Sequence, residues 1–278
     1  MRLRRFTPLA AVMLAGCTAT IDQSSFFPQD LPAPVATLAA PPGYRLEEAM
    51  VELPGLGLVH AARLDDPASE ATLVFASGNG GFVSAHTERA AALARAAGTD
   101  IVLYDYPGRG GTTVAPTVDG SIAFGPAFLD ALRARGWIGR GPLFLHGLSF
   151  GGSQAAAMAR GGGVAGVIVE NSAADIAAVG RNFVPALARP FVRLEVDPAL
   201  ARFDYLGYLV QAKAPVLLIV SEDDKIVRPR NMRDLAAQLR ARGVEVTEVT
   251  VPGGHGTALL QPAALEAIRR FVAAHGGG

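Results

Sequence analysis

The stretch that decides the fold is PLFLHGLSFG, residues 142–151, in which an apolar run leads into a glycine-serine-glycine turn. The apolar run over residues 142–146 is short and shows no alternation, which is typical of a strand buried on both faces of a sheet. The turn, residues 147–151, matches G-x-S-x-G, and an alanine-rich helical stretch follows it. The alternative interpretation is an ordinary glycine-rich turn with a capping serine. The strand before and the helix after favour a strained turn that projects the Ser149 hydroxyl as a nucleophile.

Outward from this unit, apolar β-prone runs alternate with helical stretches through most of the chain. Continuous apolar strands imply burial on both faces, so the sequence predicts an α/β fold with a mostly parallel central sheet flanked by helices. Residues 174–194 interrupt the alternation and are expected to form a small helical cap over the site, within a domain that spans residues 43–278. The expected strands cover residues 49–53, 58–63, 71–76, 100–104, 142–146, 164–169, 215–220 and 244–251, and the expected helices residues 87–97, 121–135, 154–160, 232–241 and 263–274.

A serine nucleophile needs a base, and in folds with this turn the base is a histidine that follows the serine in the chain. Only His255 and His275 follow Ser149. His255 lies in a glycine-rich loop directly after the last expected strand, whereas His275 lies beside the terminal glycines. The sequence therefore predicts His255 as the general base. Of the histidines that precede the serine, His146 is expected to pack near the site rather than to react.

The acid that orients this base is expected in the loop after the strand at residues 215–220. Three carboxylates compete there, Glu222, Asp223 and Asp224. The usual register of such a loop, an aspartate followed by one variable residue and a β-branched pair, selects Asp224. Asp223 remains the main alternative.

An oxyanion hole needs two N–H donors beside the nucleophile. One is expected to be the backbone N–H of Phe150, the residue after the serine. The other is expected from the loop SGNGG, residues 77–81, where the N–H of Asn79 is the favoured donor. A phosphate-binding loop is the rival interpretation of this glycine-rich segment, but the Gly-Lys-Ser/Thr ending is missing.

The N-terminus has the pattern of a secretory signal. Arginines at positions 2, 4 and 5 precede a short apolar run over residues 8–16, which is too short to span a bilayer as a helix. The run ends in LAGC, residues 14–17, which resembles the lipobox of bacterial lipoproteins. The sequence thus predicts a lipoprotein signal peptide over residues 1–16.

Cys17 is the only cysteine of the chain and occupies the lipobox position. The resemblance implies that its thiol receives a diacylglycerol and becomes the new N-terminus, which would anchor the protein to a membrane. An ordinary secretory signal with an incidental cysteine is the alternative. Residues 17–42 are rich in Pro, Ala, Ser and Thr and are expected to be a flexible tether. The expected location is the bacterial cell envelope, facing the periplasm, and Thr18 rather than Asp after the cysteine favours the outer membrane.

Composition excludes several classes of protein. Of the 278 residues, half are hydrophobic and the formal net charge is zero. A chain without a basic stripe is a poor candidate for binding nucleic acid. A single cysteine allows neither an intramolecular disulfide nor a cysteine-rich metal cluster, and we expect no metal and no cofactor.

Several segments together resemble the Bem46-like α/β hydrolases, which are cofactor-independent serine hydrolases. The resemblance implies an α/β-hydrolase fold, triad roles for Ser149, Asp224 and His255, an oxyanion role for Asn79, and a small-molecule acyl substrate such as an ester or thioester. This sequence departs from the family pattern at two places. Ser77-Gly78, before the oxyanion asparagine, and Val220-Ser221, before the acid loop, stand where the family usually has His-Gly. The segments that carry the resemblance are SGNGG at 77–81, YDYPGRGG at 104–111, GLSFG at 147–151, VENS at 169–172, FDY at 203–205, DKIV at 224–227 and GH at 254–255.

Two other functions remain open from the sequence. One is a non-catalytic surface lipoprotein that uses the hydrolase fold for binding, although the Ser, Asp and His in the right order speak against it. The other is a serine peptidase of the same fold, which keeps the chemistry and changes the bond.

Overall fold

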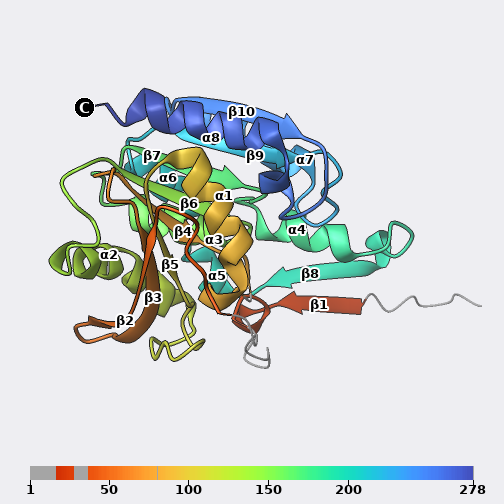
Figure 1. Cartoon of the computed structure of the whole chain (residues 1–278). Coiled ribbons are helices and arrows are strands. Elements are labelled where there is room, and N and C mark those ends of the chain that lie inside the picture. Colours follow the sequence, from red (N-terminus) through yellow and green to blue (C-terminus); the bar gives the residue numbers. More distant parts are fainter. Residues whose placement is uncertain (1–16, 28–36, 80, 278) are drawn as a thin grey trace, which may run out of the picture.

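An eight-stranded sheet forms the centre of the computed structural model, which describes residues 17–27, 37–79 and 81–277 (Figure 1). All neighbouring strands from β10 to β5 pair in parallel, and β3 pairs antiparallel with both β5 and β2. The predicted mostly parallel α/β sheet is therefore confirmed. In spatial order the strands are β10 (Val246–Val251), β9 (Val216–Ser221), β7 (Gly166–Glu170), β6 (Leu143–Leu148), β4 (Thr72–Ala76), β5 (Asp100–Tyr104), β3 (Gly57–Asp65) and β2 (Arg45–Leu53).

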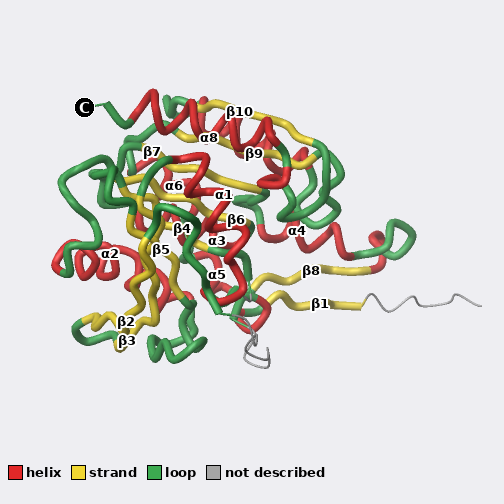
Figure 2. Tube along the Cα trace, viewed as in Figure 1, coloured by secondary structure: helices red, strands yellow, loops and turns green. Residues whose placement is uncertain are grey.

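Helices cover both faces of this sheet (Figure 2). Successive residues of a strand point to opposite faces, and in β4 Leu73 and Phe75 join one buried cluster while Val74 and Ala76 join the other. This double burial explains why the strands read as continuous apolar runs. One cluster packs under α1 (Thr87–Ala97) and α8 (Pro262–His275), and the other under α2 (Val118–Ala134), α3 (Phe150–Ala159), α6 (Tyr205–Gln211) and α7 (Pro229–Arg240).

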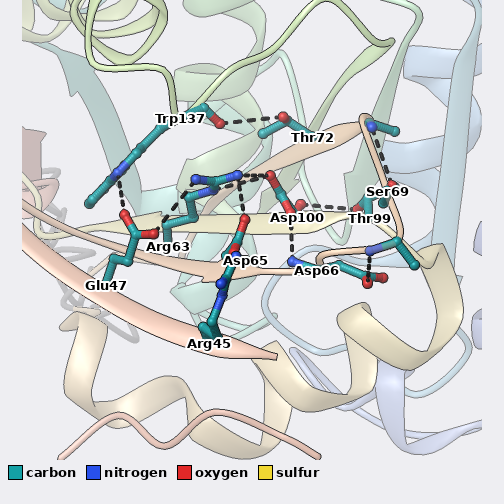
Figure 3. Close-up of polar contacts among 12 residues, drawn as sticks. Arg45, Glu47, Arg63, Asp65, Asp66, Ser69, Thr72, Thr99, Asp100 and Trp137 are labelled. Carbon is teal, nitrogen blue, oxygen red and sulfur yellow. Dashed lines mark hydrogen bonds and ion pairs between the residues drawn. The ribbon is translucent and has the colours of Figure 1, made fainter. Parts of the chain in front are cut away.

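A network of charges ties the antiparallel hairpin to the parallel part of the sheet (Figure 3). Arg63 Nη2 lies 2.6 Å from both Asp100 Oδ2 and Asp65 Oδ1. The other Asp100 oxygen accepts the N–H of Asp66 at 2.7 Å. Buried carboxylates are costly without partners, and here each has one. Burial raises the pKa of Asp100, against the lowering effect of the Asp66 N–H and the Arg63 guanidinium. These residues lie where β3 ends and β5 begins, at the end of the sheet opposite the edge where Ser149 lies.

The cap differs from the small, purely helical cap expected at residues 174–194. Between β7 and α6 the chain forms α4 (Ile176–Phe183), a short 3-10 turn η3 (Arg189–Phe191), β8 (Val192–Val196) and α5 (Pro198–Ala201). The cap thus extends beyond residue 194 and contains a strand. The reason is tertiary: β8 finds a parallel partner, β1 (Cys17–Ile21), from the far end of the sequence.

Residues 17–27, expected to belong to a flexible tether, form β1 and the 3-10 turn η1 (Gln23–Ser25) instead. Composition alone does not show that β8 needs a partner for its backbone groups, nor that Phe26 and Phe27 have an aromatic ring to pack on. Both rings lie against Phe150, with centroids 5.0 and 5.5 Å away. The expected signal peptide, residues 1–16, and residues 28–36 of the expected tether lie outside the described residues. Across the described ranges, no helix has the length and apolarity that crossing a membrane requires.

Candidate active site

Ser149 lies on a sharp turn between β6 and α3, at the carboxyl edge of the sheet. Its backbone has φ 55° and ψ −123°, a strained conformation for a residue with a side chain. The glycines around it are required by close packing: a Cβ on Gly147 would lie 2.2 Å from the carbonyl oxygen of Gly151, and one on Gly151 would lie 2.1 Å from that of Ala76. The predicted strand–turn–helix geometry is present in full.

His255 and Asp224 form a hydrogen-bonded pair. His255 Nδ1 lies 2.8 Å from Asp224 Oδ2. The other carboxylate oxygen, Oδ1, accepts the backbone N–H groups of Ile226 and Val227 at 2.8 and 2.9 Å. The Asp224 side chain is fully buried. A carboxylate held in this way fixes both the position and the tautomer of the imidazole.

Asp224 also differs in burial from the two acids that precede it in the sequence. Glu222 and Asp223 are exposed, whereas Asp224 is buried under the loop that carries His255. Of the three candidate acids, Asp224 is the one that contacts the histidine. In the pattern of an aspartate, one variable residue and a β-branched pair, the aspartate is the residue that turns inward. It does so because its carboxylate accepts hydrogen bonds from the backbone N–H groups of that pair.

Ser149 and His255 open onto one cavity of about 700 Å³. Asn79 and Phe150 line the same cavity, so the structure brings four of the predicted site residues together. None of the described lining residues is Asp, Glu, Lys or Arg. Apolar side chains close the remaining walls, and most come from the cap and from the N-terminal segment. They are Ile21, Phe26, Val118, Leu148, Ile176, Val179, Phe183, Leu200, Phe203, Ile226 and Val227.

The two segments expected to supply the oxyanion donors both lie close to the serine. Phe150 is the first residue of α3, so its N–H has no partner within the helix, and the positive end of the helix dipole is at the same place. The other loop approaches closely, since a Cβ on Gly78 would lie 3.7 Å from the Ser149 Cβ. The Asn79 side chain donates to the carbonyl oxygen of Ser25 at 2.7 Å, which ties this loop to the N-terminal segment. Gly80 lies outside the described residues.

A buried ion pair that the sequence did not reveal lies behind the histidine loop. Arg89, on α1, donates from Nη1 to Glu170 Oε2 at 2.8 Å and from Nη2 to the carbonyl oxygen of Gly256, the residue after His255. Glu170, at the carboxyl end of β7, is completely buried. His146 Nε2 lies 3.2 Å from the same carboxylate, so this histidine packs beside the site as expected.

Burial and charge act in opposite directions on this cluster. Burial raises the pKa of Glu170, but Arg89 and His146 outweigh it and hold the pKa below its usual value. Burial lowers the pKa of His146, despite the raising effect of Glu170. The stable arrangement is therefore an ionised Glu170 paired with Arg89. Glu170 could have been suspected from its place at the end of a strand, whereas nothing in the sequence indicates Arg89.

Asp105 holds the segment that directly follows the loop at residues 77–81. Its Oδ1 accepts the N–H of Val83 at 2.6 Å, and its Oδ2 lies 2.6 Å from His60 Nδ1. A Cβ on Gly110 would lie 1.6 Å from the same Oδ2, which explains a glycine with a positive φ at that place. The YDYPGRGG motif at residues 104–111 therefore supports the site structurally, a role that the sequence alone does not indicate.

The remaining predictions on ligands concern Cys17 and metals. Cys17 is exposed at the start of β1. Among the described residues no group of His, Cys, Asp and Glu side chains is arranged to hold a metal ion.

This fold and site define a class of protein. The chain belongs to the alpha/beta hydrolase family, whose model matches residues 73–268, more than half of the chain. An uncharacterized protein of Mycobacterium tuberculosis is 29% identical over 259 residues, which cover 89% of this chain and 85% of that protein. An esterase of Pyrococcus furiosus has a similar structure, with a TM-score of 0.67 and 14% identity over 88% of this chain and 100% of its own. A carboxyl esterase of the fungus Tuber melanosporum has a TM-score of 0.65 with 17% identity, over 90% of this chain and 94% of its own.

Proposed function

We propose that the protein is a serine hydrolase that cleaves ester or related acyl bonds through an acyl-enzyme intermediate. The observation that carries the proposal is the pairing of the buried Asp224 with His255, which opens onto the same uncharged cavity as the strained Ser149. A serine hydroxyl is a weak nucleophile until an oriented base takes its proton, and this arrangement supplies the base and its orientation.

In the proposed reaction the Ser149 oxygen attacks the acyl carbon while His255 Nε2, the nitrogen turned away from Asp224, takes the hydroxyl proton. The N–H groups of Phe150 and Asn79 stabilise the negative charge that develops on the carbonyl oxygen. The histidine then gives its proton to the leaving alcohol. Water attacks the acyl-enzyme with the same histidine as base, and the carboxylic acid leaves with Ser149 restored.

The cavity supports an uncharged acyl group as the part of the substrate that is recognised. A lining without Asp, Glu, Lys or Arg offers no ion pair to a charged substituent, and burying such a group without a partner is costly. Apolar walls instead favour an aliphatic or aromatic acyl chain. Membership of the Bem46-like group within the family is part of this proposal.

The proposal is tested with a soluble p-nitrophenyl ester and a fluorophosphonate probe, which labels only an activated serine. Ser149→Ala should lower turnover by about a thousandfold or more and abolish labelling, with an unchanged unfolding midpoint. Asp224→Asn should lower turnover by about two to four orders of magnitude, whereas Asp223→Asn, its exposed neighbour, should stay near the parent. Full activity of the Ser149→Ala protein would defeat the assignment, and an unlabelled parent protein would favour the non-catalytic lipoprotein.

We also infer that Cys17 carries a lipid that holds the protein at the periplasmic side of the bacterial cell envelope, with the outer membrane favoured by Thr18. The support is the lipobox at residues 14–17 together with the exposure of the Cys17 thiol at the start of β1. The mass of the mature N-terminal peptide tests this: a diacylated cysteine is expected, and an unmodified peptide retaining residues 1–16 would contradict it.

A further inference from the structure

The cap carries an arm that projects from the body of the molecule. Figure 1 shows β1 and β8 side by side, leading away from the sheet, with the end of α4 and the turn after it at the tip. Three large apolar side chains on this arm are exposed: Phe183 to 68%, Leu187 to 91% and Phe191 to 46%. Single exposed apolar residues are ordinary, but three within nine residues at the end of a projection form a patch that water solvates poorly.

Arginines alternate with these apolar side chains. Arg181 and Arg193 are exposed and Arg189 is half-buried, with its Nε donating to the carbonyl oxygen of Val184 at 3.0 Å. The segment from α4 through β8 holds one acid, Glu195, whose Oε1 lies 3.3 Å from Arg193 Nε. The tip of the arm is therefore both apolar and net positive, the combination found on protein surfaces that lie in an anionic membrane interface.

The chain outside the described structure also meets the arm at this place. In the β1–β8 register Cys17 lies opposite Val192, which directly follows the exposed Phe191. The apolar run of residues 8–16, or a lipid attached to Cys17, therefore starts at the edge of the same patch. Because an apolar segment or a lipid begins beside the exposed patch, we favour a bilayer over a second protein as the partner that covers the patch.

We propose that the tip of the arm docks on an anionic phospholipid bilayer, with Phe183, Leu187 and Phe191 immersed among the headgroups and the arginines paired with lipid phosphates. Phe183 also lines the cavity that contains Ser149. Docking by this surface therefore turns the mouth of the cavity toward the membrane. The proposal concerns binding alone, so it goes beyond the proposed hydrolysis and does not depend on it.

Vesicle binding by the full chain tests the proposal. All proteins carry Cys17→Ser, so that no lipid is attached and residues 1–16 are common to every sample. Sedimentation with vesicles of phosphatidylglycerol and phosphatidylcholine in equal amounts should show about tenfold weaker partition for Leu187→Ser/Phe191→Ser. The matched control Leu260→Ser/Met50→Ser removes apolar groups of comparable exposure elsewhere, at 74% and 44%, and should bind like the parent.

A second pair separates the charge contribution. Arg181→Gln/Arg193→Gln should weaken binding to the anionic vesicles but leave binding to pure phosphatidylcholine unchanged. The control pair Arg269→Gln/Arg270→Gln on α8 should leave binding to both kinds of vesicle unchanged. Turnover of a soluble ester and the unfolding midpoint should match the parent in the Leu187→Ser/Phe191→Ser protein, since neither residue lines the cavity.

Vesicle binding equal to that of the parent in both arm variants would overturn the proposal. So would an arm variant that turns a dimeric parent into a monomer with unchanged vesicle binding, because the patch would then belong to a contact between two copies. A parent protein without esterase activity would defeat the proposed function and leave the vesicle result intact.

Discussion

Arg89 connects two parts of the site that lie far apart in the sequence. Its guanidinium contacts the buried Glu170 carboxylate and the carbonyl oxygen of Gly256, next to the proposed base. A side chain that donates to both holds the histidine loop against the sheet. We regard Arg89 as a positioning residue, since it touches neither His255 nor the proposed nucleophile in these contacts.

Replacing this arginine separates its structural role from its positioning role. Arg89→Met leaves Glu170 buried without its cation and should cost about 3–5 kcal/mol of unfolding free energy. Adding Glu170→Gln removes the stranded charge, so the double variant should regain much of that stability. Turnover should stay about tenfold or more below the parent in both proteins, because Gly256 still lacks its donor.

Urea unfolding and the kcat of ester hydrolysis measure these two quantities side by side. Arg95→Met, at the last turn of the same helix, is a matched control that should leave both unchanged. A double variant with the parent's kcat would show that Arg89 serves stability alone.

Among the structural elements, the N-terminal segment departs most from expectation. Residues 17–27 complete the cap through β1 and complete the cavity through Ile21 and Phe26. The same segment accepts the hydrogen bond from the Asn79 side chain. A segment that composition classifies as a tether is therefore a wall of the candidate active site.

Shortening one side chain of this wall should change the acyl preference. Phe26 lines the cavity with its ring 5.0 Å from that of Phe150, and Phe26→Ala opens this space. In a series of p-nitrophenyl esters, kcat/KM for long acyl chains relative to short ones should rise by about one order of magnitude. Phe191→Ala removes a ring that is outside the cavity and should leave the profile as it is. An unchanged profile in Phe26→Ala would place the acyl group elsewhere in the cavity.

For the whole molecule, buried histidines should make stability depend on pH. Burial, and next the charge of Arg89, lower the pKa of His86 to about 4, from an ordinary value of 6.5. Its Nε2 has no hydrogen-bond partner among the described residues, and its ring packs edge-on against Phe75. Between these two pH values the unfolded chain binds a proton that the folded protein does not, so stability falls as the pH is lowered through this window.

His86→Phe keeps the ring and removes the titration. The parent should lose up to about 3 kcal/mol of unfolding free energy between pH 6.5 and 4 that the variant retains. Urea unfolding at both pH values gives the difference, and His275→Phe at the end of α8 should keep the parent's dependence. Equal losses in the parent and in His86→Phe would show that His86 is charged or solvated in the folded protein.

The sequence by itself determined the features that are encoded locally. Apolar runs fit for burial on both faces predicted the strands, and the glycines around Ser149 predicted the turn, because each depends on residues that are neighbours in the chain. The same holds for Asp224, whose carboxylate accepts N–H groups two and three residues ahead. Only the tertiary structure decided which distant segments complete the site. Arg89 and Glu170 are 81 residues apart, and Asn79 and Ser25 are 54 apart. Such contacts form only after the sheet has brought their segments together, and no local pattern of residue types records them.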